Sequence, residues 1–378
     1  MKVLIVGNYP LGYQQSMHRY AELLVQGLEI AGVDVRLIRS TPVFGRLKRG
    51  DEGLSKWLGY MDRYLLFPPL LRWRARHFDV VHIADQGNGM YASMLGNKPS
   101  VVTCHDMLAI RSALGEVSEN PTRLTGRILQ RWTLRGLKRA AHVVCVSEQT
   151  QREWWRIGFP ALSGTSVVPN ALNYPYHPMD QAERKARLDR LGVGDTPYVL
   201  HVGSNNWYKN RPGLARIFDA LAQHDTFGTF QLVIAGKALE AEVENWLLAR
   251  GHGARLIQTG PVDNEDLRAL YSGAALLLFP SLQEGFGWPI VEAQACGCLV
   301  ATTNRAPMTE VGGQGAIYFD VSDPKGAAAT IAGAWDDRDA LLGRGLENAK
   351  RYTTEAMIAG YVDAYRAVGS GNHRSESA

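Results

Sequence analysis

Short runs of aliphatic and β-branched residues recur along this chain, and each is followed by a turn and then by a stretch with helical spacing of its apolar residues. In the first half the runs are residues 3–6, 33–38, 80–83, 101–104 and 143–146. Residues 16–31 have the spacing of an amphipathic helix. Strands that alternate with helices form a parallel sheet covered by helices on both faces, so we expect an α/β fold.

The same pattern restarts in the second half. Its runs are residues 198–202, 231–235, 256–259, 276–279 and 299–302. A length of 378 residues is also more than one core usually supports. We therefore expect two Rossmann-like domains facing each other across a cleft, at residues 1–172 and 173–350, joined by the Pro-, Tyr- and Asn-rich residues 168–178. A helix at 351–368 is expected to pack back on the first domain, and residues 369–378 to form a disordered tail.

Composition limits the class of protein. An apolar fraction of 46% and a charged fraction of 21% are typical of soluble globular chains. No apolar run reaches the roughly 18 residues that a membrane span needs, and residues 1–7 have the pattern of a first strand, not of a secretory signal. Cys104, Cys145, Cys296 and Cys298 lack the spacing of a zinc site or a disulfide framework. We expect a cytoplasmic location.

Charge is unevenly distributed. Residues 1–180 have a net charge of +8 and the remainder −4, which favours an anionic surface or substrate for the first half. Arginines recur at every fourth position, and these are Arg123, Arg127, Arg131, Arg135 and Arg139. A second basic stretch, rich in aromatic residues, covers residues 46–76. Two interpretations remain open: peripheral contact with an anionic membrane, or a solvated helix face above core aromatics. No nucleic-acid partner is predicted.

The most informative motif is the segment 284–293, Glu-Gly-Phe-Gly-Trp-Pro-Ile-Val-Glu-Ala, which follows a predicted strand. Gly285 and Gly287 allow close approach of a ligand to the backbone, and Pro289 suits the first turn of a helix. The start of such a helix favours an anion such as a diphosphate. Glu284 and Glu292 can accept hydrogen bonds from vicinal hydroxyl groups. An ordinary glycine turn with two surface glutamates is the alternative.

Two further segments follow strands. Residues 201–211 include Lys209, which can reach a phosphate or can be a solvated loop lysine. Residues 103–106, Thr-Cys-His-Asp, place His105 at a strand end, where it is either a functional group or a buried histidine satisfied by the backbone.

Together these segments resemble family 4 of the retaining glycosyltransferases, which have the GT-B fold. The resemblance covers nearly the whole chain and is strongest over residues 199–312. It implies that Glu284 contacts hydroxyls of a donor sugar, Glu292 the ribose and Lys209 the diphosphate, and that His105 lies close to the reaction centre. The implied catalytic residues are His105, Glu284 and Lys209; the implied donor-binding residues are Gly12, Ser204, Lys209, Arg211, Val262, Glu284, Gly285, Phe286, Gly287 and Glu292.

The chain departs from the family pattern at two places. Ser204 stands where many members have an arginine that shares the diphosphate, so Arg211 is the remaining candidate for that contact. The loop after the first strand has Gly12 in place of a Gly-Gly pair. The single Asp-x-Asp sequence, residues 337–339, lies in a charged stretch that we expect to face solvent. No metal is therefore predicted. No cofactor is predicted either, because the nucleotide-sugar is a substrate.

The resemblance implies a metal-independent, retaining transferase that moves a hexose from a UDP- or GDP-sugar to a hydroxyl of a glycan or a lipid-linked acceptor, in the synthesis of cell-surface polysaccharide or glycolipid. Two alternatives are a GT-B sugar-nucleotide epimerase and a non-catalytic nucleotide-sugar-binding subunit. A dinucleotide-dependent oxidoreductase is disfavoured, because residues 7–12 do not form Gly-x-Gly-x-x-Gly and Arg39, not an acid, ends the second strand.

Overall fold

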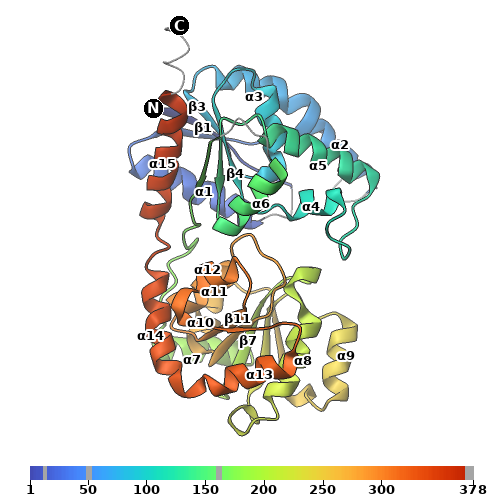
Figure 1. The fold of residues 1–378 in the computed structure, drawn as a ribbon, viewed down its shortest axis with the longest axis vertical. Coiled ribbons are helices and arrows are strands. Elements are labelled where there is room, and N and C mark those ends of the chain that lie inside the picture. Colours follow the sequence, from blue (N-terminus) through green and yellow to red (C-terminus); the bar gives the residue numbers. More distant parts are fainter. Residues whose placement is uncertain (12–14, 48–52, 159–163, 371–378) are drawn as a thin grey trace. The chain divides into compact units, whose positions relative to one another are not determined.

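The structure is a computed structural model that describes residues 1–11, 15–47, 53–158 and 164–370. The chain divides into two compact units (Figure 1). Unit 1 comprises Met1–Asn173 together with Thr354–Ala378, and unit 2 comprises Tyr174–Thr353. The sequence placed these divisions at 172/173 and 350/351.

The sheet of unit 1 is parallel throughout, with the strand order β2-β1-β3-β4-β5-β6. Its strands are β1 (Lys2–Val6), β2 (Asp34–Ile38), β3 (Val80–Ile83), β4 (Ser100–Cys104), β5 (His142–Cys145) and β6 (Gly164–Val167). The strands β3, β4 and β5 are buried along their whole length, which is why they consist of continuous apolar and β-branched runs.

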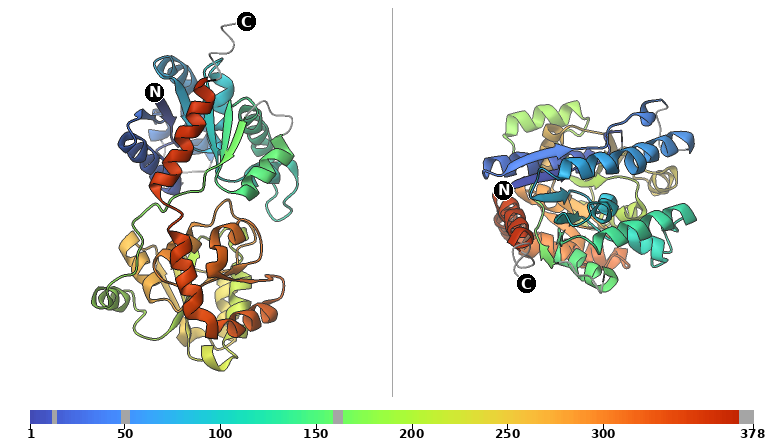
Figure 2. Two further views of the ribbon diagram at one scale, coloured as in Figure 1. Left: turned by 60° about the vertical axis from the view of Figure 1, so that its left-hand side comes forward. Right: turned by 90° about the horizontal axis from the view of Figure 1, so that it is seen from above.

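Helices cover both faces of this sheet. They are α1 (Gln15–Ile30), α2 (Gly53–Met61), α3 (Phe67–Ala75), α4 (Leu108–Leu114), α5 (Leu124–Leu137), α6 (Glu148–Gly158) and α15 (Thr354–Ser370), with the 3-10 helices η1 (Phe44–Arg46) and η3 (Gln86–Met94). A π-helical segment, η2 (Asp62–Leu66), joins α2 to α3. Figure 2 shows α15, drawn in red, lying over the strands of unit 1.

A buried polar network fastens α15 to the sheet. The Tyr365 hydroxyl lies 2.6 Å from His82 Nδ1, and His82 Nε2 lies 2.8 Å from Thr103 Oγ1. The Tyr361 hydroxyl contacts Thr103 Oγ1 at 2.9 Å and also the hydroxyl of Tyr20. The helix continues to Ser370, two residues beyond its predicted end. Residues 371–378 of the predicted tail lie outside the described residues.

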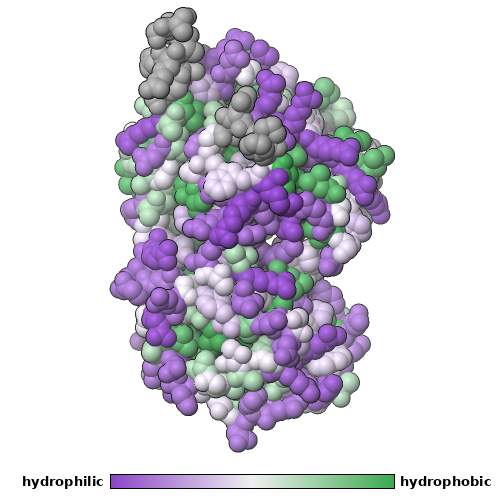
Figure 3. Space-filling model, in the orientation of Figure 1, coloured by the Kyte–Doolittle hydropathy of each residue, from purple (hydrophilic) through white to green (hydrophobic). Residues whose placement is uncertain are grey.

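The outer surface of unit 1 is mixed in polarity. On α2, η2 and α5 it exposes aliphatic and aromatic side chains, including Trp57, Leu65, Leu124 and Ile128. Figure 3 shows hydrophobic green atoms among hydrophilic purple ones over the part of unit 1 that carries these elements. Among the described residues, no helix is both long enough and apolar enough to cross a bilayer.

Unit 2 contains a second parallel sheet, with the strand order β12-β11-β10-β7-β8-β9. Its strands are β7 (Tyr198–Gly203), β8 (Gln231–Gly236), β9 (Leu256–Gly260), β10 (Leu276–Phe279), β11 (Val300–Thr303) and β12 (Ala316–Phe319). Its core includes the side chains of Val199, Leu232, Leu278 and Phe319, all at most 2% exposed.

The helices of unit 2 are α7 (Gln181–Arg190), α8 (Arg211–Leu221), α9 (Ala241–Ala249), α10 (Asn264–Gly273), α11 (Trp288–Ala295), α12 (Met308–Gly312), α13 (Pro324–Gly333) and α14 (Arg338–Ala349). The 3-10 helices are η4 (Trp207–Lys209), η5 (Asp225–Phe227), η6 (Gly253–Arg255), η7 (Gly313–Gly315) and η8 (Trp335–Asp337).

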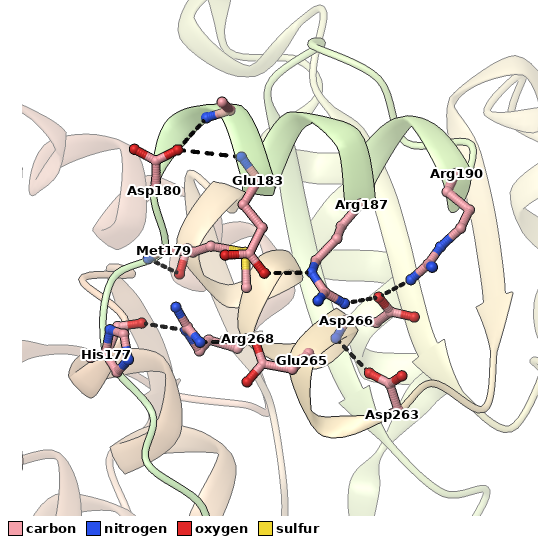
Figure 4. A network of polar contacts seen from close by, with 12 residues as sticks. His177, Met179, Asp180, Glu183, Arg187, Arg190, Asp263, Glu265, Asp266 and Arg268 are labelled. Carbon is pink, nitrogen blue, oxygen red and sulfur yellow. Dashed lines mark hydrogen bonds and ion pairs between the residues drawn. The ribbon is translucent and has the colours of Figure 1, made fainter.

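Ion pairs hold α7 against α10 (Figure 4). Arg187 Nη1 lies 3.0 Å from Asp266 Oδ1, and Arg190 pairs with the same carboxylate. On α10, Arg268 Nη1 pairs with Glu265 at 2.8 Å and its Nε donates to the carbonyl of His177 at 3.1 Å. This arrangement fixes α10, the helix that follows the loop after β9.

Both sheets have a topological switch point. In unit 1 the chain goes from β1 to β2 on one side and then continues with β3 on the other side of β1. In unit 2 the chain goes from β7 to β8 and β9 on one side and continues with β10 on the other side of β7. Ligands of open parallel sheets bind beyond the carboxyl ends of the strands at such points. A ligand site is therefore expected at the loops after β1, β3, β7 and β10.

Candidate active site

Two loops meet at the switch point of unit 2, one after β7 and one after β10. The backbone N–H of Leu282 donates to the carbonyl of Tyr208 at 2.7 Å, which joins them directly. Asn210 adds a second link, since its Nδ2 donates to the carbonyl of Pro280 at 3.1 Å while its Oδ1 accepts from Gly213 N at the start of α8. Asn210 has a left-handed φ of 52°, a conformation that asparagine tolerates better than most residues.

Lys209 and Glu284 lie on these two loops and form an ion pair. Lys209 Nζ is 2.7 Å from Glu284 Oε1, and the two side chains are only 12% and 11% exposed. The ammonium group also lies 4.8 Å from the ring centroid of Phe279 and 5.6 Å from that of Tyr208. A lysine held in this way offers a localised positive charge to a phosphate, and the carboxylate beside it offers acceptors to hydroxyl groups.

The helix α11 begins at Trp288, four residues after Glu284. Gly287 precedes it with a φ of 104°, which disfavours any residue with a Cβ atom, and Pro289 occupies its first turn, as the sequence predicts. Phe286 is buried, with its ring 5.5 Å from that of Tyr352 and 6.0 Å from that of Trp288. The Phe286 side chain therefore packs into unit 2. A predicted donor contact at Gly285–Gly287 would come from the backbone.

Glu292 lies on α11 and is buried, at 6% exposed. Its Oε2 accepts a hydrogen bond of 2.9 Å from the hydroxyl of Tyr271 on α10. Burial, and after it the neighbouring Glu292 carboxylate, raise the pKa of Tyr271 well above its usual value. Tyr271 therefore stays protonated and holds the carboxylate in one orientation. Tyr271 was not predicted as a site residue, because a tyrosine at helical spacing is indistinguishable in sequence from a core residue.

Ser204 and Val262 lie where the sequence placed them, in the loops after β7 and β9, and both are half-buried. Arg211 is buried at the start of α8, and its guanidinium donates to the carbonyls of Gly203, Lys237 and Ala238 at 2.9, 2.7 and 2.8 Å. These contacts make Arg211 a link between the loops after β7 and β8, and its contact with phosphate stays a prediction.

In unit 1, His105 directly follows β4 and is 7% exposed. Its Nε2 lies 3.0 Å from the carbonyl oxygen of Ala84, and its backbone N–H donates to Gln86 Oε1 at 2.8 Å. Burial lowers the pKa of His105, so the imidazole is neutral near pH 7. With its hydrogen on Nε2, it presents Nδ1 as an acceptor, and Nδ1 is buried without a hydrogen-bond partner among the described residues.

A polar cluster lies at the switch point of unit 1. Asp85 Oδ2 accepts from Asn8 Nδ2 at 2.5 Å, and Asn8 Oδ1 accepts from Asn88 Nδ2 at 3.1 Å. Asp85 Oδ1 also accepts from the backbone N–H of Gly87 at 2.7 Å. The sequence analysis did not select these residues, although Asn8 and Asp85 follow the ends of β1 and β3, which is the rule that selected His105. Gly12 lies outside the described residues.

The described residues contain no group of three or more His, Cys, Asp or Glu side chains suited to a metal ion. Asp337 and Asp339 of the Asp-x-Asp sequence are exposed, as expected.

Comparison with known families covers both units. Residues 184–355 match the family described as "Glycosyl transferases group 1", and residues 17–174 match the family described as "Glycosyltransferase Family 4". The chain belongs to the family 4 glycosyltransferases. The resemblance inferred from Glu284, Glu292 and Lys209 is thereby confirmed.

Among curated relatives, an O-antigen chain mannosyltransferase B of Escherichia coli is 29% identical over 246 residues, covering 64% of each chain. A serotype-specific mannosyltransferase, WbdA, of the same organism is 27% identical over 234 residues, which is 28% of its own length. The chain thus spans less than two thirds of both of these relatives. A D-inositol 3-phosphate glycosyltransferase of Corynebacterium glutamicum is 24% identical over 374 residues, covering 91% of this chain and 88% of the relative.

Solved structures confirm the fold. Anabaena HepE in complex with UDP and glucose aligns with a TM-score of 0.72 at 16% identity, covering 96% of this chain and 99% of HepE. Sucrose-phosphate synthase of Thermosynechococcus elongatus aligns with a TM-score of 0.72 at 21% identity, covering 98% and 100%. At these identities the likeness shows the fold alone, which is the predicted GT-B fold.

Proposed function

We propose that this protein is a metal-independent, retaining hexosyltransferase that uses a nucleotide diphosphate sugar, with UDP or GDP as the nucleotide. The acceptor is a hydroxyl of a glycan or a lipid-linked glycan, and the product belongs to a cell-surface polysaccharide or glycolipid. Membership of the family supports glycosyl transfer. The E. coli relatives named for mannosyl transfer and for the O-antigen chain support a hexose donor and a polysaccharide product.

One observation supports this proposal above the others: the Lys209–Glu284 ion pair at the switch point of unit 2. The lysine supplies positive charge for a diphosphate, and the start of α11, close to Glu284 in sequence, adds the positive end of a helix dipole. Glu284 and the buried Glu292 supply two carboxylates for the hydroxyls of a sugar and a ribose. The positive charge of Lys209 and the carboxylate acceptors match a nucleotide diphosphate sugar, which carries both an anion and hydroxyl groups.

In the proposed reaction, the bond between the anomeric carbon and the diphosphate oxygen breaks while positive charge develops on the sugar. Lys209 and the positive end of the α11 dipole stabilise the leaving diphosphate. The acceptor hydroxyl attacks on the face from which the diphosphate leaves, and its proton passes to an oxygen of that diphosphate. His105, kept neutral by burial, is proposed to act as a hydrogen-bonding group that carries no positive charge.

A transfer assay tests the proposal. The purified chain is incubated with UDP-glucose, UDP-galactose, UDP-N-acetylglucosamine or GDP-mannose, each with and without a mannosylated oligosaccharide, in EDTA. We expect one donor to give an acceptor-dependent product with the donor's anomeric configuration, read by proton NMR. Conversion of the donor without acceptor would instead identify an epimerase. Donor binding without hydrolysis or transfer would identify a non-catalytic subunit.

A further inference from the structure

Unit 1 exposes apolar side chains on neighbouring helices. On α2 and η2, Trp57 is 61% and Leu65 62% exposed, and on α5, Leu124 is 72% and Ile128 59% exposed. Met61 and Leu66 are exposed as well. Single exposed apolar residues are common, but a group of large ones on adjacent elements marks an interaction surface.

The segment η2 and the helix α5 contact each other. The ring centroid of Tyr64 on η2 is 5.5 Å from that of Trp132 on α5. Each helical segment precedes a strand of the parallel sheet, so both run in the same direction. Trp57 lies seven residues before Tyr64, and Leu124 lies eight residues before Trp132. Both residues are therefore about 11 Å from the Tyr64–Trp132 contact, measured along the helix axes in the same direction. The exposed apolar residues therefore belong to one surface, here called the α2–α5 surface.

The α2–α5 surface is basic around its apolar part. Arg123, Arg127, Arg131, Arg135 and Arg139 are all exposed, as is Lys56. Residues 123–139 contain no acidic residue. The single acid in residues 53–76 is Asp62, which is buried and accepts from the backbone N–H groups of Phe44 and Gly45 at 3.0 and 2.9 Å. Within the described residues, no arginine of α5 forms an ion pair with a carboxylate, so this charge is not neutralised from within unit 1.

We propose that the α2–α5 surface docks on an anionic lipid bilayer. Aliphatic and tryptophan side chains enter the boundary between headgroups and acyl chains, while the surrounding arginines contact lipid phosphates. A second copy of the chain fits this surface less well. In a two-fold dimer the same surface faces itself, which would set the arginine rows of two α5 helices against each other.

The position of this surface also bears on the kind of acceptor, an inference that rests on the proposed function. The chain leaves β4 at the carboxyl edge of the sheet, where His105 lies, and α5 then leads back to the start of β5. The first turn of α5, with Leu124, thus begins on the same edge of the sheet as His105. Docking through the α2–α5 surface would bring that edge close to the bilayer, which favours a lipid-linked acceptor over a soluble one.

Sedimentation with lipid vesicles tests the docking. The full chain is mixed with vesicles of phosphatidylglycerol and phosphatidylcholine at 1:1 and, separately, of phosphatidylcholine alone. We expect binding to the anionic vesicles and at least tenfold weaker binding to the neutral ones. The variant Arg131→Gln/Arg135→Gln should bind the anionic vesicles roughly 25-fold more weakly, since each basic residue near such a surface contributes about fivefold. The variant Leu124→Ser/Ile128→Ser should lose most of its binding in 150 mM salt, where apolar insertion dominates.

Matched variants on unit 2 separate docking from a general change in charge or polarity. Arg216→Gln/Lys325→Gln and Leu248→Ser/Leu346→Ser alter exposed residues of the same types on α8, α13, α9 and α14, and should bind vesicles like the unaltered chain. The proposal is overturned if the unaltered chain does not bind anionic vesicles, or if variants of both surfaces bind equally. It is also overturned if Leu124→Ser/Ile128→Ser converts a dimer to a monomer in analytical ultracentrifugation without changing vesicle binding. Vesicle binding needs no sugar transfer, so its outcome is independent of the proposed reaction.

Discussion

Lys209 and Glu284 lie 75 residues apart in the sequence and form a 2.7 Å ion pair in unit 2. The pair connects the loops after β7 and β10, which the Leu282–Tyr208 backbone bond and Asn210 also join. Without ligand, each charge satisfies the other. A diphosphate sugar that bound here would offer phosphate oxygens to Lys209 and hydroxyls to Glu284, so that both side chains exchange one partner for another without becoming unpaired.

Replacement of either member of the pair is expected to abolish most transfer. Lys209→Ala removes the charge that stabilises the leaving diphosphate, and Glu284→Ala removes acceptors for the sugar. We expect Lys209→Ala to lower kcat/KM by about 100-fold or more, which is the usual effect of losing one group that stabilises a developing negative charge. Glu284→Ala should lower it by roughly 10-fold or more, since a hydrogen bond to a charged group contributes about 1.5–3 kcal/mol. The measurement is the initial rate of product formation with the donor identified in the transfer assay.

A matched control for this experiment is Lys325→Ala, which removes an exposed lysine of α13 in the same unit. Circular dichroism should show that all three variants are folded. Near-normal rates in Lys209→Ala and Glu284→Ala would contradict the assigned roles.

Tyr271→Phe is expected to weaken donor binding through Glu292. The substitution removes the 2.9 Å hydrogen bond that orients the carboxylate and should cost about 1 kcal/mol of stability. Because Tyr271 acts on the proposed ribose contact, we expect KM for the donor to rise several-fold with a smaller change in kcat. Tyr198→Phe is the control, since its buried hydroxyl donates to the carbonyl of Leu270 at 2.6 Å and has no contact with Glu292. Equal changes of KM in both variants would show a general loss of stability instead.

Acid is expected to destabilise unit 1 through His82. Burial, followed by the neighbouring His105, lowers the pKa of His82 to about 3, whereas an unfolded histidine titrates near 6.5. Above pH 6.5 the imidazole is neutral in both states and stability does not depend on it. As pH falls from 6.5 toward 3, only the unfolded state takes up the proton. Stability is therefore lost at about 1.4 kcal/mol per pH unit, or about 2 kcal/mol by pH 5.

Urea unfolding at pH 7, 6 and 5 measures this dependence. His82→Asn should be less stable at pH 7, because it disturbs the contacts with Tyr365 and Thr103, but its stability should fall less steeply with acid. His177→Asn, which changes an exposed histidine, should keep the original slope. An unchanged slope in His82→Asn would assign the acid sensitivity to other groups.

Most of the fold is evident in the sequence, because buried parallel strands must be continuous apolar runs. The exceptions are β6 and β12. The β6 residues, Gly-Thr-Ser-Val, form an edge strand whose side chains are at least partly exposed, so the chain needs no apolar run there. The β12 residues, Ala-Ile-Tyr-Phe, are a mostly buried apolar run of the same kind as the predicted strands, and this run was overlooked.

Residues of the candidate site were predictable only where the residue type and its position in the chain together indicate a chemical role. Glu284, Glu292 and Lys209 combine charge with a position after a strand or at a helix start, and the structure places Lys209 against Glu284. Tyr271 and Asn210 act by hydrogen bonding to other residues, which depends on the packing of α10 and α8 and leaves no pattern in the sequence. Arg211 was named for its charge and its place just beyond Lys209, and the sequence did not show that its guanidinium donates to backbone carbonyls.

A crystal structure of the chain with UDP or GDP, whichever stabilises it against heat, tests the central claim most directly. We predict that the diphosphate lies within hydrogen-bonding distance of Lys209 Nζ, about 3 Å, at the start of α11, with Glu284 released from the lysine. A diphosphate bound elsewhere, with the 2.7 Å Lys209–Glu284 pair intact, would contradict the account.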